Sequence, residues 1–189
     1  MKYSEIENIV NHYFPNLDGD SLNSVTKQSS FFKSTKGTRL ISEGKRHNYF
    51  YICLKGAVKS YYSKDYRDVY TWFAFEDEVI ATMSTCEGLP SKETIELLED
   101  SEFIRFNIQE LKELSKSDLQ IIHLLNALTV EHTLYMEERL YQLQFMTSEE
   151  RYNVLIDNSS EILQRVSLTD IASYLGVSRE TLSRIRGKK

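Results

Sequence analysis

Apolar residues recur at helical spacing near both ends of this chain, and a different pattern fills its middle. The first stripes predict helices over residues 4–14 and 21–28. From Phe31 onward, short runs rich in β-branched and aromatic residues alternate with turn signals such as Lys36-Gly37. We expect strands over residues 38–41, 49–54, 57–62, 69–75, 94–98 and 102–107, with a strand end, a short helix and a loop over 76–91. Short strands at this spacing favour an antiparallel sandwich or barrel.

After Asn107 the period becomes helical again, first over residues 108–114 and then over 118–145, which contain no glycine or proline. The long helix has two apolar rows. The first consists of Ile121, Leu125, Leu128, His132 and Tyr135, and the second of Leu124, Met136, Leu140 and Leu143. A domain of this size covers one side of so long a helix, so we expect one row to meet the sheet and another a second chain. We assign the first row to a dimer interface; a helix covered entirely by its own chain is the alternative.

Thr147 and Glu150 have the spacing of a capping box, which starts a new helix and predicts a hinge over residues 145–148. Farther on, Thr169 is a candidate cap for a short helix that ends at Gly176. Ser178 is a candidate cap for a second helix, whose polar face contains Arg179, Glu180, Ser183, Arg184 and Arg186. Two short helices joined by a glycine turn predict a helix-turn-helix. A generic helical hairpin explains the apolar spacing equally well, and only the polar face favours DNA.

The charge distribution agrees with a nucleic-acid partner. From Arg179 to the end the chain has five basic residues and one acidic residue, a net charge of +4, whereas the whole chain has −5 and the preceding residues therefore −9. A basic tip on an acidic protein concentrates its attraction for phosphate in one place. A frayed, solvated tail is the alternative, and such a tail does not need helix caps.

Composition argues against several classes of protein. The 189 residues suffice for one large domain, or a medium domain with a small one attached. The two cysteines form no Cys-x-x-Cys pair and the four histidines no metal-spaced cluster, so we expect no metal, no cofactor and no enzymatic activity. No apolar run approaches the roughly 20 residues of a membrane span, and the first residues lack a signal-peptide core. A cytoplasmic protein without a membrane partner is expected.

The order of roll, long helix, hinge and helix-turn-helix resembles the CRP/FNR family of bacterial transcription regulators, from about Phe31 to the end. The run from Gly176 to Ile185, Gly-Val-Ser-Arg-Glu-Thr-Leu-Ser-Arg-Ile, is similar to that family's recognition helix. The resemblance implies an α+β fold with an antiparallel β-roll of the cyclic-nucleotide-binding type. It also implies a division into a sensor domain (1–115), a dimerisation helix with hinge (116–146) and a DNA-binding domain (147–189). The DNA-contacting residues implied are Ser178, Arg179, Glu180, Ser183, Arg184, Arg186 and Lys188.

Base readout in that family implies roles for Arg179, Glu180 and Arg184. An arginine presents two donors to guanine O6 and N7, and a glutamate accepts from cytosine N4. Arg186, Lys188 and Lys189 are assigned to phosphates, which contribute affinity without sequence information. No wing strands follow Arg186, so DNA contact is expected to rest on the second helix and its tail.

The chain departs from the family at the cyclic-AMP cassette. The ribose-binding glutamate falls near Thr82 and the phosphate-binding arginine near Ser91, and residues 76–78 are all acidic. An anionic phosphate would meet repulsion there, so we expect no cyclic-AMP binding. The pocket then holds another small molecule or is filled by side chains. Its candidate residues are Val79, Ile80, Thr82, Met83, Ser91 and Lys92.

We therefore predict a homodimeric DNA-binding regulator that recognises a pseudo-palindromic operator in duplex DNA, with half-sites about 34 Å apart. RNA polymerase and an unidentified small-molecule effector are its other candidate partners. The alternative from a different class is a small-molecule-binding β-roll whose C-terminal helices serve protein–protein packing.

Overall fold

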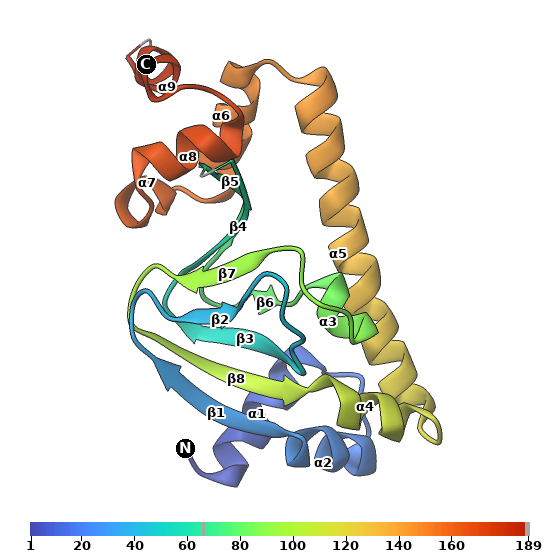
Figure 1. Cartoon of the computed structure of the whole chain (residues 1–189). Coiled ribbons are helices and arrows are strands. Elements are labelled where there is room, and N and C mark those ends of the chain that lie inside the picture. Colours follow the sequence, from blue (N-terminus) through green and yellow to red (C-terminus); the bar gives the residue numbers. More distant parts are fainter. Residues whose placement is uncertain (66, 188–189) are drawn as a thin grey trace.

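The computed structural model describes residues 1–65 and 67–187. A β-roll flanked by helices is followed by one long helix and a C-terminal group of short helices (Figure 1). This α+β architecture confirms the predicted fold class. No helix within the described residues has the length and apolarity needed to cross a membrane.

The roll consists of two four-stranded antiparallel sheets, ordered β1-β8-β3-β6 and β2-β7-β4-β5. Its strands are β1 (Ser29–Ser34), β2 (Arg39–Ile41), β3 (Tyr49–Lys55), β4 (Val58–Lys64), β5 (Arg67–Ala74), β6 (Val79–Ile80), β7 (Thr94–Leu97) and β8 (Ser101–Asn107). The core between the sheets includes Trp72, Ile95, Phe103 and the buried Cys53. Burial raises the pKa of the Cys53 thiol to about 12, as expected of a cysteine that serves as a small apolar residue. Cys86 is only half-buried.

Helices cover the outside of the roll and form the rest of the molecule. They are α1 (Tyr3–Tyr13), α2 (Gly19–Lys27), α3 (Met83–Glu87), α4 (Ile108–Ser115), α5 (Leu119–Phe145), α6 (Ser148–Asn158), α7 (Ile162–Arg165), α8 (Leu168–Leu175) and α9 (Arg179–Arg186). Side chains of α1, α2, α4 and α5 form one apolar cluster with the outer face of β3 and β8, where the rings of Phe50 and Phe106 stack 4.7 Å apart. Strand β1 and helix α7 were not predicted, because neither has an apolar period of its own.

The long helix and its end agree with the sequence pattern. Asp118 caps α5 by accepting a hydrogen bond from the Gln120 amide at 2.9 Å. The chain leaves α5 at Met146 and restarts at Thr147, which forms the predicted capping box with Glu150. The break between the two helices therefore lies within residues 145–148, where the hinge is predicted.

The C-terminal helices pack against the hairpin of β4 and β5, which rises from the roll to α8 in Figure 1. On this hairpin, Lys59 forms an ion pair with Asp170 of α8 at 3.6 Å, and the backbone carbonyl of Asp68 accepts a hydrogen bond from Ser173 at 3.1 Å. The ring of Phe73 lies 5.5 Å from that of Tyr174. Apolar and polar contacts together hold α8 on the roll.

Gly56, in the turn between β3 and β4, is the glycine that the roll constrains most. Its φ is +116°, and a Cβ there would lie 2.0 Å from the Ser101 hydroxyl oxygen and 2.9 Å from the Ser101 Cα. Gly56→Ala is therefore expected to lower the free energy of unfolding by about 2–4 kcal/mol, measured by urea denaturation.

Gly19→Ala is the matched control for this prediction. Gly19 lies at the start of α2 without a positive φ, and a Cβ there would meet nothing within 4 Å. Its substitution should leave stability unchanged or slightly increased, because alanine favours helix. Equal stability of the two variants would contradict the proposed steric role of Gly56.

Candidate nucleic-acid interface and effector cavity

Helices α8 and α9 form a helix-turn-helix whose local structure follows from its sequence. Gly176 ends α8 with a left-handed φ of +70°, and the Val177 amide donates to the Ala172 carbonyl at 2.9 Å. Ser178 caps α9 by accepting from the Thr181 amide at 3.2 Å. Leu182 and Ile185 are buried, as predicted. The cap of α8 was predicted wrongly: Ser167, rather than Thr169, accepts the hydrogen bond of the first turn.

The opposite face of α9 is open to solvent. The exposed predicted DNA-contacting residues are Ser178, Arg179, Glu180, Ser183, Arg184 and Arg186. None of the three arginines forms a salt bridge with a described residue. Hydrogen bonding from its own backbone amide and from Ser178 lowers the pKa of Glu180, so this side chain is an ionised acceptor at the start of the helix. Lys188 and Lys189 lie outside the described residues.

Two arginines that the sequence reasoning missed join the helix-turn-helix to the long helix. Arg151 donates to the Met146 carbonyl at 2.6 Å, where α5 ends, and to the Leu175 carbonyl at 2.9 Å, where α8 ends. Arg139, 9% exposed, donates to the Tyr174 carbonyl and lies 3.8 Å from the centre of that ring. Arg139 follows Tyr135 by four residues, so its position as a continuation of the row from Ile121 to Tyr135 was the available signal.

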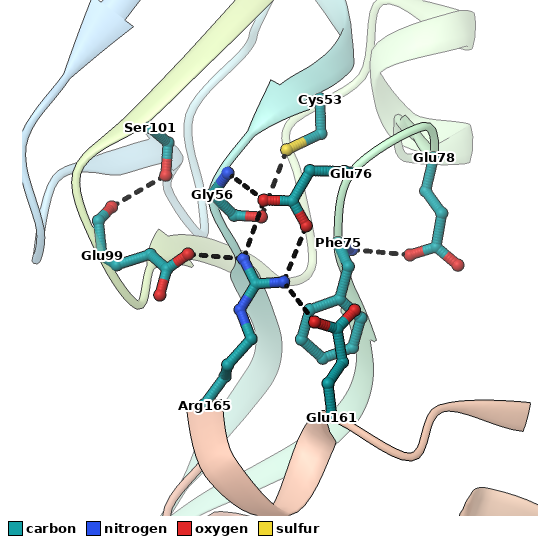
Figure 2. A network of polar contacts seen from close by, with 9 residues as sticks. All are labelled: Cys53, Gly56, Phe75, Glu76, Glu78, Glu99, Ser101, Glu161 and Arg165. Carbon is teal, nitrogen blue, oxygen red and sulfur yellow. Dashed lines mark hydrogen bonds and ion pairs between the residues drawn. The ribbon is translucent and has the colours of Figure 1, made fainter.

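A third arginine joins α7 to one end of the roll (Figure 2). Arg165 makes two parallel hydrogen bonds to Glu76, at 2.7 and 3.0 Å, and a further one to Glu99 at 2.5 Å. Its guanidinium lies over the Phe75 ring, 4.9 Å from the centre, and Glu76 also accepts from the Gly56 amide at 2.7 Å. One arginine therefore connects three turns of the roll to the C-terminal helices.

The Arg165 junction predicts an acid-sensitive stability. Hydrogen bonds from Arg165 lower the pKa of Glu76 from 4.5 to about 2. Because the folded-state pKa is depressed, the contribution is present above pH 4.5 and is lost as the pH falls towards about 2. Arg165→Gln should lower the free energy of unfolding at pH 7 by about 1–2 kcal/mol, since the glutamates are partly exposed, and should flatten the acid dependence. Urea denaturation across this pH range measures both effects.

Lys33→Gln provides the control, since Lys33 pairs with Glu102 at 2.7 Å on the exposed surface of the roll. That substitution should have no measurable effect on stability. Identical acid profiles for the wild type and Arg165→Gln would show that the junction does not stabilise the fold.

Helix α5 presents an exposed apolar face on the side away from its own chain. This apolar α5 face consists of Ile122, Val130, Leu134, Met136, Leu140, Tyr141, Leu143 and Phe145, which are 36–73% exposed. The inward side contains Ile121, Leu124, Arg139 and Gln142, all buried. Exposed apolar faces of this extent are typical of interaction surfaces.

Much of the predicted dimer row faces the chain's own roll. Ile121 is completely buried against the roll, and Leu125 and Leu128 pack on the same cluster. His132 and Tyr135 line a cavity between α5 and the roll. The prediction that one row meets the sheet is confirmed, but this row is the one predicted for the partner, so the placement of Ile121 at a dimer interface is wrong.

Comparisons with known proteins agree with this architecture. Residues 32–118 match the family model of the cyclic nucleotide-binding domain. FixK2 from Bradyrhizobium japonicum is 24% identical, with a TM-score of 0.74 over 85% of this chain and 83% of its own. A putative transcriptional regulator of the CRP/FNR family from Eubacterium rectale is 16% identical, with a TM-score of 0.74 over 94% of this chain and 87% of its own.

The c-di-GMP-responsive global regulator CLP from Xanthomonas campestris is 17% identical, with a TM-score of 0.69 over 90% of this chain and 91% of its own. No curated protein sequence matches the chain. The chain has the CRP/FNR fold. The matched domain consists of the roll with α3 and α4, and the helix-turn-helix with the open face of α9 lies beyond it, after α5.

A cavity of about 470 Å³ lies between the roll and α5. Three of the predicted effector residues, Val79, Thr82 and Met83, line it. The other three do not: Ile80 is buried inside the roll, Ser91 is buried with its hydroxyl donated to the Glu93 carbonyl at 2.8 Å, and Lys92 is exposed. The predicted pocket is therefore displaced towards α5 and α1, as the lining residues Tyr13, Phe14, Leu125, Leu128 and His132 show.

The side chain of Glu93 places a carboxyl group inside the roll, beside Ser91. Glu93 accepts hydrogen bonds from the Ser60 hydroxyl and from the Trp72 indole, the latter at 3.1 Å. Burial raises the pKa of Glu93, and no described lysine or arginine forms a salt bridge with it. A phosphate group beside this buried carboxyl group would be unfavourable. The absence of cyclic-AMP binding therefore stays a prediction, and Glu93 supports it.

Proposed function

We propose that this protein is a homodimeric, sequence-specific DNA-binding regulator of transcription. The observation that carries the proposal is the exposed face of α9, where Arg179, Glu180 and Arg184 have no salt-bridge partner that would occupy them among the described residues. In a helix-turn-helix this face enters the major groove, where such side chains pair with guanine and cytosine edges. Arg186 and Lys188 are assigned to phosphates.

The proposal assigns residues 1–115 to a sensor domain, 116–146 to dimerisation and hinge, and 147–189 to DNA binding. Dimerisation is assigned to the apolar α5 face, because two such faces packed together bury side chains that one chain leaves exposed. Two-fold symmetry then pairs two recognition helices with a pseudo-palindromic operator. RNA polymerase and a small-molecule effector other than cyclic AMP complete the proposed partners, in the cytoplasm where chromosomal DNA lies.

Selection of sequences from a random duplex pool on the purified protein tests this function. The expected result is enrichment of a palindrome with half-sites separated by about one helical turn, 10–10.5 base pairs. Parallel selections with and without a small-molecule extract of the native cells reveal an effector requirement. Absence of enrichment in both, at low salt, would favour the rival in which the C-terminal helices serve protein–protein packing.

A further inference from the structure

The cavity between the roll and α5 is large enough for a drug-sized molecule and has mostly apolar walls. Its volume of about 470 Å³ lies within the usual range of ligand sites, roughly 300–1,000 Å³. Phe50, Trp72, Phe73, Leu125 and Leu128 supply apolar and aromatic surface from the sheets and from α5. A ligand with a hydrocarbon or aromatic body would bury that body here.

The charged groups of the lining are mostly acidic. Glu87 pairs with Lys112 at 3.6 Å, so these two side chains neutralise each other. Asp77, Glu78 and Glu131 remain, and none of them forms a salt bridge with a described residue.

Each of these three carboxylates can still accept a hydrogen bond from a ligand. Asp77 accepts a hydrogen bond from the Tyr13 hydroxyl at 2.6 Å, and Glu78 accepts one from the Phe75 amide at 2.7 Å. Burial raises the pKa of Glu78, and the nearby charge of Glu131 adds to this. A cation placed among these groups would relieve their repulsion, whereas an anion would add to it.

The remaining titratable side chains of the lining supply no competing cation. Burial lowers the pKa of His132, so this side chain is a neutral imidazole at pH 7. Its uncharged ring lies on the α5 side of the cavity, beside Glu131.

We propose that this cavity binds a small amphiphilic amine: an apolar or aromatic body with one positively charged group at the carboxylates. Its role as the effector rests on the proposed function, but its binding does not require DNA. Anionic nucleotides are excluded by the same charges.

Two residues that line the cavity also contact the helix-turn-helix. Phe73 and Tyr135 line it, and both interact with Tyr174 of α8: the rings of Phe73 and Tyr174 lie 5.5 Å apart, and Tyr135 interacts electrostatically with Tyr174. The guanidinium of Arg139 also lies over the Tyr174 ring, 3.8 Å from its centre. A bound amine that moves Phe73 or Tyr135 would therefore shift α8. These contacts provide a route from the cavity to the recognition helix α9.

The single tryptophan of the chain, Trp72, lines the cavity and reports binding by its fluorescence. The probes are 4-phenylbutylamine, 4-phenylbutanol and 4-phenylbutyrate, which share one body and differ in charge, together with cyclic AMP. Titrated into the full-length protein at pH 7, the amine should give a saturable change and bind at least about ten-fold more tightly than the carboxylate, a difference of 1.4 kcal/mol. The alcohol should fall between them, and cyclic AMP should give no change.

Asp77→Asn, Glu78→Gln and Glu131→Gln combined should remove the preference for the amine while leaving the affinity for the alcohol unchanged. Glu137→Gln is the matched control, because Glu137 is an exposed carboxylate on α5 outside the cavity lining. Tighter binding of the carboxylate or of cyclic AMP, or no saturable change with any probe, would overturn the proposal. Operator binding by the same preparation is measured separately. The absence of amine binding and the absence of DNA binding can therefore be distinguished.

Discussion

Replacing Arg179 and Arg184 together by alanine is expected to weaken binding to the selected operator roughly 10²- to 10³-fold. Each guanidinium that pairs with a guanine contributes about 1–3 kcal/mol of discrimination, and the two side chains stand on the same exposed face of α9. Neither side chain packs in the core, so the fold should be unchanged. Fluorescence anisotropy with labelled operator and with a scrambled duplex measures the loss of affinity and of specificity together.

Arg67→Ala is the control for this experiment, since Arg67 is an exposed arginine on β5 of the roll. It should bind the operator as the wild type does. If the double variant also retained full specific affinity, the assignment of α9 as the recognition helix would be wrong.

The second large effect is expected on the apolar α5 face. Leu134→Asp with Leu140→Asp should convert the dimer to a monomer, because both side chains are more than half exposed in one chain, 58% and 55%. Burying a leucine contributes about 1.5–3 kcal/mol, and a buried unpaired carboxylate opposes association further. Sedimentation velocity should show the mass of one 22.1 kDa chain.

Leu89→Asp is the matched control, because Leu89 is 53% exposed but lies beyond α3 and not on α5. It should leave the dimer intact. Aspartate at Leu125 or Leu128 should instead destabilise the protein, since both positions pack inside the chain. A dimer of unchanged affinity in the Leu134/Leu140 double variant would refute the interface on the apolar α5 face.

The features that the sequence predicts correctly are those that depend on residues close together in the chain. The Thr147 capping box, the Gly176 turn and the Ser178 cap each involve residues within a few positions of one another, and each appears in the structure as expected. The displaced cap at Ser167 is an error of two residues in the same kind of signal. The strand spacing likewise sufficed for the roll, although not for the polar strand β1.

The errors on α5 have a physical cause. This helix is apolar around most of its circumference, so the pattern shows two rows without showing which one the roll covers. That choice depends on how α4 and the turn before Asp118 orient the helix. Ile121 was therefore placed at the partner, although it is completely buried in its own chain.

The interdomain contacts could not be predicted for a related reason. Arg165 and Glu76 are separated by 89 residues, and nothing near either of them identifies the other. Arg139 and Arg151 bond to backbone carbonyls, which have no signature in the sequence. The acidic run 76–78 is visible in the sequence, but only the structure shows that Glu76 belongs to the Arg165 junction and that Asp77 and Glu78 line the cavity.

The central claim is that one dimer presents two copies of α9 to two half-sites of an operator. The most direct test inserts about five base pairs, half a helical turn, between the half-sites of the selected operator and measures affinity again. The predicted result is that affinity falls to that of a scrambled duplex, and that an insertion of about ten base pairs does not fully restore it because the helix spacing is set by the dimer. Unchanged affinity after the half-turn insertion would contradict the account, since it would mean that the two recognition helices do not act as one unit.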